Sequence, residues 1–184
     1  MGSIKSTGKA IDISVVVPCY NEQGALPFYY DKMKEVMALL PELSFEIIIV
    51  DDGSTDGTLE VAKQLAKSDD RIRYISFSRN FGKEAAMYAG LKNALGKYTA
   101  IMDADLQDPP EMLPEMYRVI TEEGYDAVGT RRVTRKGEPP VRSFFARKFY
   151  KIMSRISKAN MVDGARDYRL MNRKYVDALL SLGE

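Results

Sequence analysis

Residues 98–112 read YTAIMDADLQDPPEM, and this stretch joins an apolar run to a cluster of acids. Tyr98–Met102 is short, apolar and rich in residues that favour strands. It is followed directly by Asp103 and Asp105, and then by Gln107 and Asp108. Carboxylates so close together repel each other and cannot be buried unpaired. The stretch therefore predicts a strand whose end faces a positive partner.

Four further runs of the same apolar, β-rich kind lie on either side of this one: Ile13–Pro18, Phe45–Val50, Ile72–Phe77 and Asp126–Gly129. Continuous apolar runs suit strands that are buried on both faces of a parallel sheet. Because helical patterns separate them, the sequence predicts a single α/β domain with a Rossmann-like, doubly wound, mostly parallel sheet. In such sheets ligands bind beyond the carboxyl ends of the strands, where the polar clusters of this chain fall.

The helical patterns have three- or four-residue spacing. The first helix is expected to turn its apolar side inward at Leu26, Tyr30, Met33, Met37 and Leu40. Ser54 and Thr55 are expected to cap the second, and small residues near Gly90 place the third close to the sheet. A fourth helix is predicted from Pro110 to Glu123.

The amino-acid composition excludes several kinds of partner and catalytic site. With 184 residues and 45% hydrophobic content the chain can form one well-cored domain, and a net charge of +1 gives no reason to expect nucleic acid as a partner. The one cysteine, Cys19, cannot form an internal disulfide. Since there is no histidine, a Ser-His-Asp triad and His-ligated zinc are excluded, which leaves carboxylates, Lys, Tyr and Arg.

Charge is distributed unevenly along the chain. Ten Lys and Arg residues lie between Arg131 and Lys158, against the single acid Glu138. We expect residues 1–12 to form a flexible N-terminal segment, 13–130 the α/β core that carries the ligand crevice, and 131–184 a basic loop and helices. The apolar stripe of this basic segment, which includes Phe145 and Phe149, either lies at an anionic membrane surface or packs on the core.

Each polar cluster has a functional and a structural interpretation. Asp103, Asp105 and Gln107 offer oxygen ligands for a divalent cation, or form an acidic turn before a helix. In VDDGSTDGT (50–58), a carboxylate could bind a ribose or base, or belong to an ordinary turn. The Tyr and Glu of PCYNE (18–22) could contact the base and the ribose. Lys83, at a helix start, could bind phosphate or be solvated.

Taken together, PCYNE, VDDGSTD, RNFGKEAA, DADLQDPPE, GTRR and GARDYRLMNRKY resemble, in order and spacing, the family 2 glycosyltransferases. Within them they resemble the polyprenyl-phosphate branch, which includes dolichyl-phosphate mannosyltransferases and bactoprenol glucosyltransferases. The resemblance implies a glycosyltransferase A-type fold, a nucleotide-diphosphate sugar donor with a UDP-sugar favoured, and Mg²⁺ or Mn²⁺. It also implies inverting transfer to a polyprenyl phosphate at the cytoplasmic face of a membrane.

The resemblance also implies roles for individual residues. The nucleoside would be held by Pro18, Tyr20, Glu22, Val50 and Asp52, and the metal by Asp103, Asp105 and Gln107. Arg131 and Arg142 would contact phosphate, while Asp167 and Arg169 would act on the acceptor side; Asp105, Arg131, Asp167 and Arg169 form the catalytic set. In RDYRL, Arg166 and Tyr168 stand where the family usually has Gly and Phe.

Two alternatives remain open at this point. The first is a glycosyltransferase that acts on a hydroxyl of a soluble sugar or a polysaccharide. The second, from another class, is a phosphoryl-accepting regulatory domain, in which paired acids, a later acid and a lysine also follow strand ends. The chain is expected to stop before C-terminal membrane helices common in the branch, so that the 184 residues are soluble. The oligomeric state stays open, and a homo-oligomer of the full-length protein is one of the alternatives.

Overall fold

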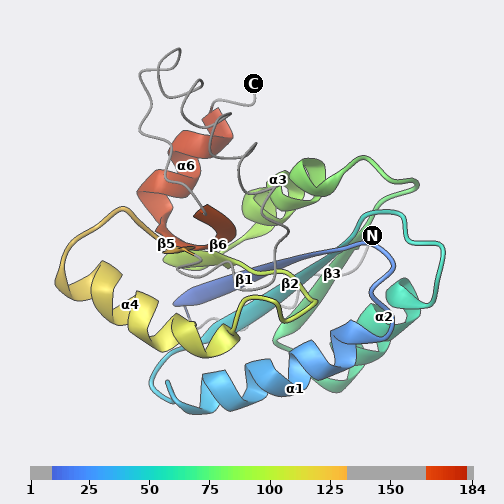
Figure 1. Ribbon diagram of the computed structural model, residues 1–184, viewed down its shortest axis with the longest axis horizontal. Helices are drawn as coiled ribbons and strands as arrows, with labels where there is room; N and C mark the ends of the chain where they lie inside the picture. Colours follow the sequence, from blue (N-terminus) through green and yellow to red (C-terminus); the bar gives the residue numbers. More distant parts are fainter. Residues whose placement is uncertain (1–9, 132–164, 182–184) are drawn as a thin grey trace, which may run out of the picture.

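Six strands form one sheet within residues 10–131 and 165–181, the part of the chain that the computed structural model describes (Figure 1). The sheet consists of β1 (Ile13–Cys19), β2 (Phe45–Asp51), β3 (Ile72–Ser76), β4 (Tyr98–Ile101), β5 (Ala127–Arg131) and β6 (Ala165–Asn172). The helices are α1 (Ala25–Ala38), α2 (Thr58–Ser68), α3 (Lys83–Asn93), α4 (Leu113–Glu122) and α6 (Arg173–Ser181), with a 3₁₀ turn, η1 (Pro110–Met112), before α4.

The strand order is β3-β2-β1-β4-β6-β5. Strands β1 to β4 pair in parallel, whereas β6 lies antiparallel to both of its neighbours, β4 and β5. The predicted α/β fold with a mostly parallel sheet is therefore confirmed. Strand β6 is missing from the prediction, and it places the C-terminal part of the described chain inside the same sheet as residues 13–131.

Helices cover both faces of the sheet (Figure 1). Side chains from α1, α2 and α4 share one core cluster, and side chains from α3 and α6 share the other. Strand β1 shows why its sequence is continuously apolar: Val15 and Val17 belong to the first cluster, Val16 belongs to the second, and all three are fully buried. Burying a valine side chain stabilises the fold by about 1.5–3 kcal/mol.

Helix α3 packs unusually close to the sheet at Gly90. A Cβ atom at this position would overlap the side chain of Val16, so only glycine fits without a shift. The prediction that small residues bring the third helix close to the sheet is confirmed here. This contact fixes the distance of α3, and of its first residue, Lys83, from β1.

Two local predictions need correction. The second helix begins at Thr58 and not after a Ser54 or Thr55 cap, since Asp56 accepts the N–H of Thr58 at 2.9 Å. The loop before it is hydrogen-bonded to another loop instead, as described below. On α1, the buried positions include Tyr29 and Val36, whereas Tyr30 is only partly buried and donates its hydroxyl to Asp69.

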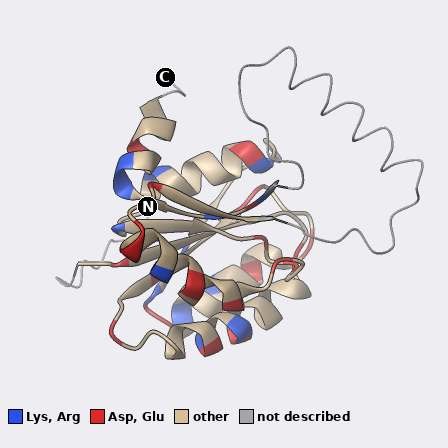
Figure 2. Ribbon diagram, turned by 60° about the vertical axis from the view of Figure 1, so that its left-hand side comes forward, with Lys and Arg blue, Asp and Glu red and all other residues tan. Residues whose placement is uncertain are grey.

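The outer faces of the helices carry Lys and Arg next to Asp and Glu (Figure 2). On α1, for example, Lys32 pairs with Glu35 and Lys34 pairs with Asp31. Such exposed pairs contribute little to stability, ~0–1 kcal/mol each. Charged residues with a functional role are therefore expected at the carboxyl ends of the strands.

Candidate active site

A cleft of about 300 Å³ lies where β1, β2 and β4 end and α3 begins. Its lining comes from four separate segments of the chain, and it brings together the predicted Pro18, Tyr20, Glu22, Asp52, Lys83, Asp103 and Asp105. Cys19, Asn80, Gly82, Ala86 and Ala104 complete the lining. The position agrees with the expectation that ligands bind beyond the carboxyl ends of the strands.

The loops after β1 and β2 are joined by a set of hydrogen bonds. Asn21 donates its N–H to Ser54 Oγ at 3.0 Å and accepts the N–H of Thr55 on Oδ1 at 2.9 Å. Glu22 donates its N–H to Thr58 Oγ1 at 2.8 Å. Asn21 has a φ of 58°, a left-handed conformation that asparagine tolerates better than most residues. These hydrogen bonds hold Tyr20 and Glu22 at the cleft. The residues that Asn21 and Glu22 bind are 33 to 36 positions away along the chain, and these pairings were not predicted.

Asp52 fixes the loop that leads into α3. Its carboxylate accepts the N–H of Phe81 at 2.7 Å and the N–H of Gly82 at 2.9 Å, and the side chain is buried. Next to it, Gly53 has a φ of +67° and lies against the backbone of Arg79, where a Cβ atom would collide. The sequence pattern DDG thus positions the start of α3 in addition to lining the cleft.

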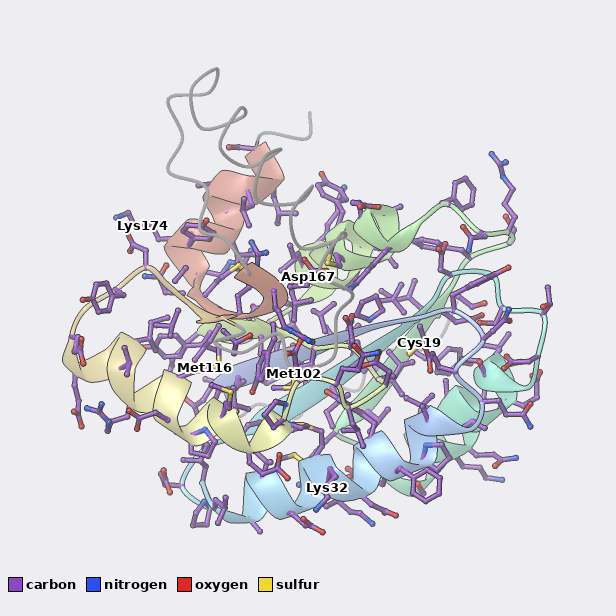
Figure 3. All side chains as sticks on the ribbon, viewed as in Figure 1. Cys19, Lys32, Met102, Met116, Asp167 and Lys174 are labelled. Carbon is purple, nitrogen blue, oxygen red and sulfur yellow. The ribbon has the colours of Figure 1, made fainter. Side chains whose placement is uncertain are left out.

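Lys83 lies between two carboxylates. Its Nζ is 2.7 Å from Asp103 Oδ1 and 2.8 Å from Asp167 Oδ2. Partial burial alone would lower the pKa of Lys83, but the hydrogen bonds to Asp103 and Asp167 outweigh it and raise the pKa. Lys83 is therefore a positive partner of the kind predicted for the acids that follow β4, and it contacts Asp103 among them. Asp167, labelled in Figure 3, lies on β6 beside the start of α3.

Glu22 and Asp105 form no ion pair within residues 10–131 and 165–181. Partial burial raises the pKa of Glu22, and the charges of Asp105 and Asp103 raise it further. Asp105 is exposed, and its Oδ1 accepts the N–H of Gln107 at 3.0 Å. A divalent cation would relieve this repulsion. Among residues 10–131 and 165–181, however, no three acid, His or Cys side chains are grouped closely enough to hold a metal by themselves.

The structure adds one residue that the sequence did not single out for a role. Arg166 Nη1 lies 2.9 Å from Asp108 Oδ1, and both side chains are largely buried. This ion pair attaches the acidic loop after β4 to the beginning of β6. The Arg that replaces the usual family Gly thus has a structural partner in this chain.

Val50, Gln107 and Arg169 are not among the residues that line the cleft. Val50 is fully buried in the core of the sheet, and Gln107 is exposed beside Asp105. Arg169 is partly buried, with Nη2 3.7 Å from Asp167 Oδ1. Arg131 is the last residue of β5, and Arg142 lies outside the described residues together with most of the basic segment.

Cys19 lines the cleft but is 2% exposed. Burial raises the pKa of its thiol, and the charges of Glu22 and Asp51 add to the effect. A thiol in this state is a poor nucleophile. Cys19 is therefore a packing residue of the cleft floor.

Residues 14–180 match a family model described as Glycosyl transferase family 2. The chain is 41% identical over 174 residues to the uncharacterized glycosyltransferase sll0501 of Synechocystis, which covers 95% of this chain and 54% of that protein. It is 38% identical over 172 residues to the bactoprenol glucosyl transferase of Shigella phage SfV, covering 94% and 55%. The chain thus spans about half the length of the curated relatives it matches.

Two solved structures share the fold. A mannosyltransferase from Pyrobaculum calidifontis, in complex with GDP-Man and Mn²⁺, aligns with a TM-score of 0.64 at 22% identity, covering 91% of this chain and 46% of that one. S. aureus TarS 1-349 in complex with UDP aligns with a TM-score of 0.56 at 25% identity, covering 70% and 38%.

None of the helices within residues 10–131 and 165–181 combines the length and the apolar character needed to cross a bilayer.

Proposed function

Because the chain belongs to glycosyltransferase family 2, we propose that it transfers a sugar from a nucleotide-diphosphate sugar to the phosphate of a polyprenyl lipid. One observation carries this proposal. A single cleft holds the Tyr and Glu of PCYNE, the buried Asp52, the acids Asp103 and Asp105, and a lysine. This combination offers a flat ring for a base, acceptors for a ribose and charges for a diphosphate.

The acceptor follows from the relatives. Bactoprenol glucosyl transferase of Shigella phage SfV is 38% identical over nearly the whole of this chain, and its name states a polyprenyl acceptor. The donor we favour is a UDP-sugar, which is supported by the UDP complex of TarS at 25% identity. The phosphoryl-accepting regulatory domain finds no support in the family match and is not proposed further.

Residues of the cleft fit a divalent cation. Asp103 and Asp105 lie two residues apart beside Glu22, whose pKa is raised by partial burial and further by the charges of these two acids. We propose Asp103 and Asp105 as ligands of Mg²⁺ or Mn²⁺, with Gln107 as a neutral oxygen ligand. Oxygens of the nucleotide-sugar diphosphate would complete the coordination. Such an ion, when bound, supplies Lewis-acid stabilisation of the departing diphosphate.

The proposed reaction needs no strong base. A phosphate oxygen of the lipid attacks the anomeric carbon from the side opposite the nucleotide, a new C–O bond forms, and the bond to the diphosphate breaks. The acceptor phosphate is ionised near pH 7, so no proton has to be removed. Lys83 and Arg131, with Arg142 as a second arginine, would stabilise the negative charge that develops on the leaving group. Asp167 and Arg169 would orient the acceptor.

The donor is tested first by a thermal-shift screen of the 184-residue chain with UDP, GDP and their sugar conjugates, with and without Mn²⁺. A ligand that binds only the native state raises the apparent melting temperature. We expect the largest shift with a UDP-sugar and Mn²⁺ together. Equal shifts from all nucleotides, or none from any, would contradict the donor assignment.

The acceptor is tested with the full-length protein, a radiolabelled UDP-sugar and either polyprenyl phosphate in detergent or soluble oligosaccharides. Label in the lipid fraction supports the proposal, whereas label on oligosaccharide hydroxyls supports the alternative acceptor. The variant Arg131→Ala should lower kcat for transfer more than it raises the Kd for UDP, because its charge acts on the leaving group.

At the membrane, the basic segment 131–158 provides the proposed contact with anionic lipid. Each Lys or Arg near such a surface contributes about 1 kcal/mol. Binding of the full-length protein and of the 184-residue chain to vesicles with and without anionic lipid would measure this contribution. A homo-oligomer of the full-length protein is likewise a proposal, which light scattering of the purified protein would test.

A further inference from the structure

Lys83, Asp103 and Asp167 come from three different elements and meet at one point. Lys83 is the first residue of α3, Asp103 follows β4, and Asp167 lies on β6. The ammonium is 2.7 Å from Asp103 and 2.8 Å from Asp167, and their side chains are between 31% and 46% exposed. From the sequence, this lysine was a candidate to bind phosphate. In the structure it forms ion pairs with two carboxylates of the protein itself.

The register of the sheet explains why a cation is needed there. In the antiparallel pair of β4 and β6, Ile101 lies opposite Arg169. Continuing this register by two residues along each chain brings Asp103 opposite Asp167. Like charges directly opposite each other on neighbouring strands are destabilising. Lys83 therefore neutralises a repulsion that the topology of the sheet creates.

The position of Lys83 is fixed from both sides. The turn before it is held by Asp52, which accepts the N–H groups of Phe81 and Gly82. The helix after it is held by the close contact of Gly90 with Val16. The ammonium is thus held in place by the fold, and two of its three N–H donors are used by the acids.

We propose that Lys83 is the internal counter-ion of Asp103 and Asp167, and that it competes with a divalent cation for Asp103. The inference rests on the proposed function only in naming Asp103 as a metal ligand. When a metal binds Asp103, Lys83 keeps its contact with Asp167 and gains free donors for a phosphate oxygen. Lys83 thus has two roles: it positions the two acids before any metal or donor binds, and it contacts the diphosphate after a metal has taken its place at Asp103.

The test uses Mn²⁺ alone, without nucleotide, and measures its binding to the 184-residue chain by electron paramagnetic resonance. In Lys83→Met the competitor is removed, so Mn²⁺ should bind about fivefold more tightly, the change expected for the loss of one partly exposed ion pair. Lys83→Arg retains the charge and should bind Mn²⁺ like the wild type. Lys92→Met, which changes an exposed lysine at the other end of α3, is the matched control.

A general loss of structure is excluded by thermal unfolding of each variant and by rescue in Lys83→Arg. If Lys83→Met binds Mn²⁺ as weakly as the wild type, more weakly, or not at all, the inference is overturned. A lysine that only binds phosphate would leave metal affinity unchanged and weaken UDP binding instead. Failure of the proposed function appears on a different readout, the transfer of sugar by the full-length protein.

Discussion

The buried carboxylate of Glu46 lies 2.8 Å from the guanidinium of Arg73, at the end of the sheet opposite the cleft. The other carboxylate oxygen of Glu46 accepts the hydroxyl of Ser14 at 2.5 Å and the N–H of Leu95 at 2.7 Å. Ser14 in turn accepts the N–H of Gly96 at 2.8 Å. This network joins β1, β2, β3 and the turn between α3 and β4.

We expect Glu46→Ala to lower the free energy of unfolding by about 2–4 kcal/mol, because the Ser14 hydroxyl and the Leu95 N–H lose their acceptor and the Arg73 guanidinium keeps only the carbonyl of Asn93. Urea denaturation measures this loss. Binding of UDP should be unchanged at temperatures where the variant is folded. A loss of stability below ~0.5 kcal/mol would show that the network is not needed for the fold.

Asp105→Ala should abolish the contribution of Mn²⁺ to donor binding while leaving the fold intact. Asp105 is exposed and faces other acids, so its removal relieves repulsion and costs little stability. Calorimetric titration of a UDP-sugar with and without Mn²⁺ measures the effect. Asp70→Ala changes an exposed acid outside the cleft lining and is the matched control. Unchanged metal-supported affinity in Asp105→Ala would remove Asp105 from the proposed ligand set.

Gly90→Ala should destabilise the protein by about 1–3 kcal/mol, the usual range for an added methyl group in a packed core. The new Cβ overlaps the side chain of Val16, so α3 has to move away from β1. In the double variant Val16→Ala with Gly90→Ala, the space reopens and part of the loss should be recovered. Additive losses in this double-mutant cycle would show that the two residues are not coupled.

The free energy of unfolding should fall at acid pH, because Asp69 becomes protonated. Hydrogen bonds from Arg71, together with one from Tyr30, lower the pKa of Asp69 from 3.8 to about 2. Since the folded pKa is the lower one, the stabilisation is complete above the unfolded value of 3.8 and disappears as the pH falls from about 4 to about 2. We expect a loss of ~1–2 kcal/mol over this window, reduced by the exposure of Arg71. Asp69→Asn should have a flatter profile in urea denaturation between pH 5 and pH 2.

The sequence was sufficient to predict strands β1 to β5 and the helices between them. Strands β1 and β2 are runs buried on both faces, and β4 is buried after its first residue. Strand β3, in contrast, alternates between more buried and more exposed residues. Strand β6 was not predicted. In residues 165–172 the charged Asp167 and Arg169 alternate with the buried Tyr168 and Leu170. This alternation with a period of two is the signal that would have identified it.

For the cleft, the acids and the lysine were identified from their position after strands, but their partners were not. Lys83 is 20 residues from Asp103 and 84 residues from Asp167 along the chain. Nothing in a local pattern states which of several acids a lysine will meet. The same holds for Asp52, whose hydrogen bonds to Phe81 and Gly82 depend on the way in which two loops approach each other.

The antiparallel insertion of β6 has a consequence for the synthesis of the protein. Strand β4 can pair with β1 as soon as residue 101 has left the ribosome, but its other edge gains a partner only when residues 165–172 emerge. Until then the nascent chain presents an unpaired edge next to two aspartates, and exposed strand edges attract other chains. Charged residues beside such an edge disfavour its pairing with other chains, and Asp103 and Asp105 lie directly after β4.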